Sequence, residues 1–68
     1  MTLQRAITLY IAKNKLSMKE FGALVGVAGQ TIYNIESVGQ TPSRLTRAKI
    51  QLVLGNEYEL DDEEDEND

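Results

Sequence analysis

The chain has 68 residues, 41% of them hydrophobic, and a formal net charge of −4. A chain of this length forms one domain around one small core. It has no cysteine and no histidine, which excludes disulfides and thiolate or imidazole metal sites and removes the usual general base. We therefore expect no metal, no cofactor, no small-molecule substrate and no enzymatic activity. No apolar run approaches the roughly 18 residues of a membrane span, so we expect an intracellular binding module that does not bind a membrane.

Charge is distributed unevenly along the chain. Residues 1–56 carry seven basic and two acidic side chains, whereas residues 57–68 carry nine acidic and no basic ones. This asymmetry suggests a polyanion-binding face and a separate charged appendage. We expect a domain over 1–56 and an acidic tail over 57–68, disordered from Asp61 onward. The tail could mimic nucleic acid, covering the basic face in cis or a partner's basic face in trans, or it could only aid solubility.

The first half of the chain predicts three helices. A first helix, over about 2–14, follows from the helical spacing of Leu3, Ala6, Ile7, Tyr10 and Ile11. The pair Ser17 and Glu20 is typical of a capping box, which begins a second helix over about 18–25, and Gly26 can end that helix in a left-handed conformation. A third helix is expected from near Ala28 to Gly39. Its buried face would consist of Ala28, Thr31, Ile32, Ile35 and Val38.

A fourth helix is expected over about 43–54, with Gly55 at its end. Asn56 and Glu59 could cap a short fifth helix that docks Tyr58 and Leu60 on the body. Apolar residues cover more of the fourth helix than a small core needs, so a homodimer could form. The residues that could pair two subunits are Ile50, Val53 and Leu54, with Tyr58 and Leu60. The fold class expected is all-α: a compact four- to five-helix bundle with an acidic C-terminal tail.

Two short helices joined by a glycine-centred turn are the pattern of a helix-turn-helix motif, here at about 17–37. The stretch Leu16 to Gly22, then Gly26-Val27, Ile32, Ile35-Glu36, Pro42-Ser43, Lys49-Ile50 and Leu54-Gly55, resembles the Cro and lambda-repressor-like (Xre-type) family of phage and bacterial DNA-binding regulators. The opening and the acidic tail are also similar to those of modulator-of-repression proteins, the antirepressors of temperate lactococcal phages. Gly22 fits the small-residue position where the next helix crosses.

The resemblance implies that the third helix enters the major groove of double-stranded operator DNA. Gln30 and Asn34 point the same way, and both amides can pair with adenine. Thr31 would contact a phosphate or a thymine methyl, whereas Gly29 offers only backbone where the family often has a long polar side chain. The residues expected to contact the DNA backbone are Lys19, Gln40, Thr41, Ser43 and Arg44. Outside a binding motif, the same amides would be ordinary solvated side chains.

Three positions depart from the family pattern. Met18 replaces a polar phosphate contact, Ala28 replaces the usual Ser or Thr cap of the third helix, and Ile11 replaces an arginine that pairs with the glutamate matching Glu36. Tyr33 is an exposed aromatic residue that could stack on a sugar, anchor a protein partner or pack on a neighbour. Met18 and Tyr33 are therefore the candidate contacts to a partner protein.

The leading hypothesis is a transcription regulator of a phage lysis/lysogeny-type genetic switch, cytoplasmic in the bacterial host, that binds operator DNA through its third helix. The alternative is an antirepressor, in which the same fold binds a phage repressor protein and modulates or blocks its DNA binding. A structural or toxin-neutralising role is a third alternative. The +5 charge of residues 1–56 and the two amides favour DNA, whereas Met18, Tyr33 and the acidic tail favour the antirepressor.

Overall fold

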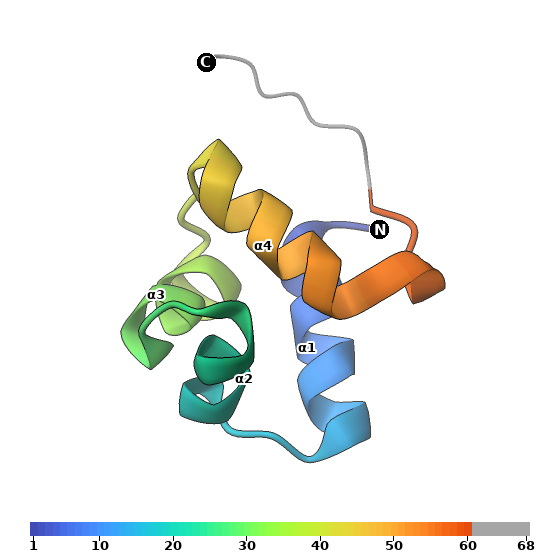
Figure 1. Cartoon of the computed structure of the whole chain (residues 1–68), viewed down its shortest axis with the longest axis horizontal. Coiled ribbons are helices and arrows are strands. Elements are labelled where there is room, and N and C mark those ends of the chain that lie inside the picture. Colours follow the sequence, from blue (N-terminus) through green and yellow to red (C-terminus); the bar gives the residue numbers. More distant parts are fainter. Residues whose placement is uncertain (61–68) are drawn as a thin grey trace.

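The computed structural model describes residues 1–60, and over these residues it contains helices and no strand, which confirms the expected all-α class (Figure 1). The α-helices are α1 (Leu3–Asn14), α2 (Met18–Val25), α3 (Gly29–Tyr33) and α4 (Arg44–Leu54). A π-helical segment, η1 (Asn34–Val38), continues α3, and a 3₁₀ turn, η2 (Gly55–Glu57), follows α4.

The helix starts follow the capping residues in the sequence. The capping box at α2 is complete: the Ser17 hydroxyl accepts a hydrogen bond from the Glu20 N–H at 3.0 Å, and the Glu20 carboxylate accepts one from the Ser17 N–H at 2.7 Å. The Ser43 hydroxyl caps α4 by accepting from the Thr46 N–H at 3.2 Å. Gly26, with a φ of +95°, ends α2 in the left-handed region as expected.

The core lies where α1, α2, α3 and α4 meet, and its largest fully buried side chains are Ile7, Phe21, Ile32, Ile35 and Ile50. Gly22 lies beneath the α2–α3 turn, where a Cβ atom would be only 2.7 Å from the carbonyl oxygen of Val27. The interpretation of Gly22 as a small residue at a helix crossing is therefore confirmed, because any side chain there would push the two helices apart.

The third helix differs from the expectation in its second half. From Asn34 the hydrogen bonding widens to a π turn, which ends at Gly39 with a φ of +89°. The wider turn changes the angular spacing of the side chains, so the face predicted at 100° per residue does not continue. Val38, expected in the core, is 65% exposed, and Ala28 is also exposed, whereas Ile32 and Ile35 are buried as expected.

Residues 57–60, which we call the C-terminal strap, pack against α1 (Figure 1). Tyr58 and Leu60 contact the core, as expected, and the Tyr58 ring meets Tyr10 edge-on at 6.3 Å between centroids. Glu57 forms an ion pair with Lys13, and the N-terminal amine donates a hydrogen bond to the Glu59 carbonyl at 2.7 Å. The expected fifth α-helix is replaced by the 3₁₀ turn η2.

The residues proposed to pair two subunits are largely used within one chain. Ile50 and Leu54 are buried in the core, and Val53 packs against it. The exposed apolar residues of α4 are instead Leu45, at 67%, and Leu52, at 83%. The prediction that Ile50 and Leu54 could pair two subunits was wrong, because apolar residues on several sides of a helix do not show which side faces the core. The disorder predicted for residues 61–68 lies outside the described residues.

Candidate recognition surface on α2 and α3

Gly29 brings the start of α3 against the start of α2. A Cβ atom on Gly29 would lie 2.9 Å from the Lys19 Cα and 3.2 Å from the Lys19 nitrogen, both of them backbone atoms. Neither atom can move without shifting α2. Gly29 therefore has a packing role, because the close approach of the two helices leaves no room for a side chain there.

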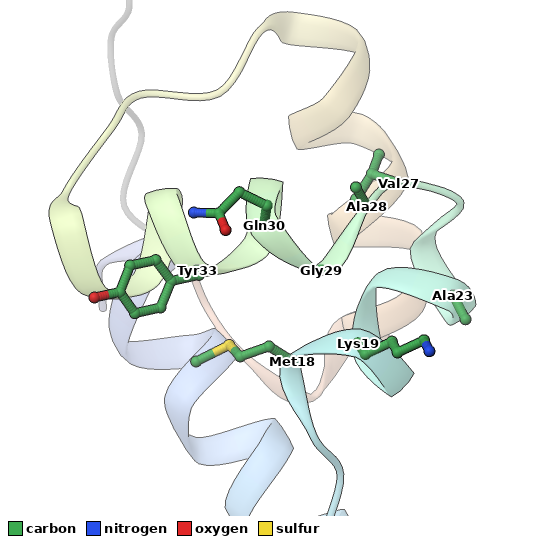
Figure 2. A pocket seen from close by; sticks show the side chains of 8 residues that line it. All are labelled: Met18, Lys19, Ala23, Val27, Ala28, Gly29, Gln30 and Tyr33. Carbon is green, nitrogen blue, oxygen red and sulfur yellow. The ribbon is translucent and has the colours of Figure 1, made fainter.

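An open hollow of about 710 Å³ lies across the first turns of the two helices (Figure 2). Its lining is mainly apolar, and Lys19 is the only charged residue in it. The lining consists of Met18, Lys19, Ala23, Val27, Ala28, Gly29, Gln30 and Tyr33. Figure 2 shows Met18 and Tyr33 toward one end of the hollow, and Ala23, Val27 and Ala28 toward the other. Both candidate contacts to a partner protein thus belong to one surface.

The two candidate base-reading amides bond to each other. Gln30 Nε2 donates to Asn34 Oδ1 at 3.0 Å, so they do lie one turn apart on one face of the helix. Gln30 is exposed and lines the hollow, whereas Asn34 and Thr31 are half-buried and do not line it. This bond uses one of the two Nε2 donors of Gln30 and one lone pair of Asn34 Oδ1, so each amide keeps further donor and acceptor capacity.

The candidate DNA-backbone contacts divide into two groups. Lys19 is exposed at the hollow, in the first turn of α2. The other four residues, Gln40, Thr41, Ser43 and Arg44, are exposed in the loop before α4 or at its start and do not line the hollow. The Ser43 hydroxyl is already engaged, since it accepts from the Thr46 N–H and also donates to the Thr46 hydroxyl at 3.1 Å.

Glu36 has hydroxyl groups as its hydrogen-bond partners. Its carboxylate accepts hydrogen bonds from the Ser37 hydroxyl at 2.5 Å and from the Thr8 hydroxyl of α1. These bonds stabilise the charged form, so Ser37 first and Thr8 second lower the pKa of Glu36 below its ordinary value. The contact ties η1 to α1, which makes Glu36 a structural residue behind the recognition surface.

Ala23 and Val27 line the hollow but were not among the candidate contact residues predicted from the sequence. The available signal was the composition of the turn: Val27 and Ala28 are apolar where a polar helix cap is usual, and Ala28 makes no side-chain cap bond to α3. Ala23 lies four residues after Lys19, on the same side of α2. A search for small apolar residues near the turn would have added Ala23 and Val27 to the residues already predicted.

The described residues show neither a membrane-spanning helix nor a metal site. Within residues 1–60, no helix has both the length and the hydrophobicity of a membrane span. The same residues contain no group of three or more acidic side chains placed to hold a metal ion. Comparisons with protein-family models, curated proteins and solved structures found no match to this chain.

Proposed function

We propose that the protein is a helix-turn-helix regulator of a phage-type genetic switch, and that it acts as an antirepressor. Its α2–α3 surface binds a repressor protein and modulates or blocks the binding of that repressor to DNA. Such a role places it in the cytoplasm of a bacterial host. The observation that carries the proposal is the apolar hollow, which occupies the surface where a DNA-reading helix-turn-helix would be polar.

The chemistry of the hollow fits a protein partner better than a duplex. Protein interfaces have a desolvated centre with aromatic and methionine anchors. Tyr33, 47% exposed, and Met18, half-buried, are residues of this type on opposite helices. DNA binding gains most of its affinity from several phosphate contacts, and Lys19 is the only cation in the lining.

Titration against the purified repressor encoded beside this gene tests the proposal. Tyr33→Ala should weaken the complex by about 2 kcal/mol or more, as expected for an aromatic anchor at an interface. The matched control is Leu52→Ala on α4, which removes a more exposed apolar side chain, 83% accessible, outside the hollow. Equal affinities for the two variants, or no complex with the wild-type protein, would contradict the antirepressor proposal.

Operator DNA is the second candidate, supported by the outward amide of Gln30 and the exposed cations Lys19 and Arg44. In this case Gln30→Ala and Asn34→Ala should each lower affinity for the operator by about 1–3 kcal/mol and leave random DNA almost unaffected. Lys19→Ala and Arg44→Ala should weaken both kinds of DNA alike. Gel-shift titration with the neighbouring intergenic DNA, at low and moderate salt, separates the two candidates.

A further inference from the structure

The positive charge of Lys19 restricts which surface of a partner protein can bind in the hollow. Lys19 is exposed and lines the hollow. No carboxylate among residues 1–60 lies within ion-pair distance of it, and Glu57, which pairs with Lys13, lies elsewhere. Glu20, the next residue along α2, uses its carboxylate in the capping box. Within residues 1–60, the hollow therefore presents a positive charge that no carboxylate pairs with, beside apolar walls.

Lys19 is also unfavourably placed for the stability of its own helix. It lies in the first turn of α2, where the helix dipole favours acidic side chains and disfavours cations. Its hydrocarbon stem lies against the start of α3, with the Cβ atom near Gly29. In Figure 2 the Lys19 side chain runs along the edge of the hollow on the side of Ala23. The ammonium group thus marks one edge of the surface.

Resting on the antirepressor function proposed above, we propose that the partner fills the hollow with an apolar side chain and pairs a carboxylate from the same face with Lys19. The apolar group would lie between Met18 and Tyr33 on one side and Val27 and Ala28 on the other. The carboxylate would meet the ammonium group at the edge. An amphipathic helix that carries an apolar side chain and a carboxylate on the same face meets this requirement.

This complementarity selects among the surfaces of a repressor. A DNA-reading surface is rich in arginine and lysine, and those cations would be set against Lys19. A neutral or acidic apolar surface of the repressor avoids this repulsion. The contact made by the hollow therefore lies on the repressor away from the cations that bind phosphates.

Charge reversal at Lys19 provides the test, with the purified adjacent repressor as the probe. Lys19→Ala should weaken the complex about 5- to 20-fold and flatten its salt dependence, and Lys19→Glu should weaken it further. Arg5→Glu is the matched control, because Arg5 is an exposed cation in the first turn of α1, outside the hollow. Both reversals place an acid near a helix N-terminus, which favours folding, so weaker binding cannot be ascribed to unfolding.

The outcomes separate this inference from the function on which it rests. A complex that Tyr33→Ala weakens, but that Lys19→Glu leaves unchanged or strengthens, would overturn the carboxylate contact while the antirepressor function stands. Absence of any complex with wild-type protein would overturn both. The inference is supported if Lys19→Glu weakens the complex and Arg5→Glu does not. A Glu→Lys or Asp→Lys substitution in the repressor should then restore the affinity for the Lys19→Glu variant.

Discussion

Gly29 lies at the closest approach of α2 and α3, and the absence of a side chain permits that approach. In an ordinary helix position, alanine is favoured over glycine by about 0.8–1 kcal/mol. Here the added Cβ would lie 2.9 Å from the Lys19 Cα, which is closer than packed carbon atoms can be. The clash involves backbone on both sides, so it outweighs the gain in helix propensity.

Gly29→Ala should therefore lower the free energy of unfolding by about 1–3 kcal/mol, the usual range for overpacking. Urea denaturation followed by circular dichroism measures the change. Gln30→Ala, one residue later on an exposed position, should leave stability nearly unchanged apart from the lost bond to Asn34. An increase in stability for Gly29→Ala would show that α2 and α3 can separate without loss, and the structure of the hollow would then be wrong.

Glu36 makes the stability of the fold depend on acidity. Hydrogen bonds from Ser37 and Thr8 lower its pKa in the folded state, so folding favours the charged carboxylate. Its stabilising contribution is fully present above the unfolded-state pKa of about 4.3. The contribution decreases as the pH falls below that value and is lost once the pH passes the lower pKa of the folded protein.

Glu36→Gln should consequently reduce the dependence of stability on pH below about pH 4.3. Thermal unfolding of both proteins from pH 7 to pH 2.5, compared as a difference between the two curves, isolates Glu36 from the other carboxylates. Thr8→Val, which removes one donor, should cost about 0.5–1.5 kcal/mol at neutral pH and less at acid pH. Parallel curves for wild type and Glu36→Gln would contradict this role.

At the scale of an element, α3 is the least well supported helix of the described chain. It contains five residues, lacks a side-chain cap at Ala28 and changes to π geometry after Tyr33. It is positioned instead by its packing, with Ile32 fully buried and Gly29 against α2. Tertiary contacts therefore replace local stabilisation in the helix that carries part of the candidate recognition surface.

Ala28→Ser should stabilise the protein by about 1 kcal/mol, because the Ala28 backbone already has the extended conformation of a capping residue. Chemical denaturation detects this gain. Ala28→Val, which adds volume without an acceptor, is the control and should not produce it. If Ala28→Ser gives no stabilisation, the N–H groups of the first turn of α3 do not need a side-chain cap.

At the scale of the whole molecule, the C-terminal strap covers one side of the core. Tyr58 and Leu60 cover the core beside Tyr10, and Glu57 and Glu59 join the strap to Lys13 and to the N-terminal amine. Glu57 raises the pKa of Lys13 through a hydrogen bond and its charge. The N-terminus and the C-terminal strap thus meet beside α1 (Figure 1), away from the hollow formed by α2 and α3.

Truncation after Asn56 should lower the unfolding free energy by about 2–4 kcal/mol, because it exposes the apolar surface that the half-buried side chains of Tyr58 and Leu60 cover. Truncation after Leu60 removes no apolar side chain, and its thermal midpoint should stay close to that of the full chain. Scanning calorimetry of the two truncated proteins makes the comparison. Equal midpoints would show that the strap contributes nothing to the fold.

Much of this protein follows from local sequence. Periodic apolar residues place the four α-helices, and Ser17 with Glu20, Gly26 and Gly39 mark their ends, because caps and left-handed turns depend on only a few neighbouring residues. The candidate surface could also be predicted in part from the sequence: Met18, Lys19, Gln30 and Tyr33 were all predicted contact residues, and all four line the hollow. These residues stand out by type within a short motif.

The tertiary structure decided what depends on contacts between distant residues. The change to π geometry turned Val38 outward, and the core took Ile50 and Leu54 from the several apolar residues of α4. Thr8 on α1 became a hydrogen-bond partner of Glu36. The hollow itself needs α2 and α3 in contact, with Ala23 and Val27 brought beside Tyr33. Periodicity describes one helix at a time, whereas such choices are made by the packing of several helices around one small core.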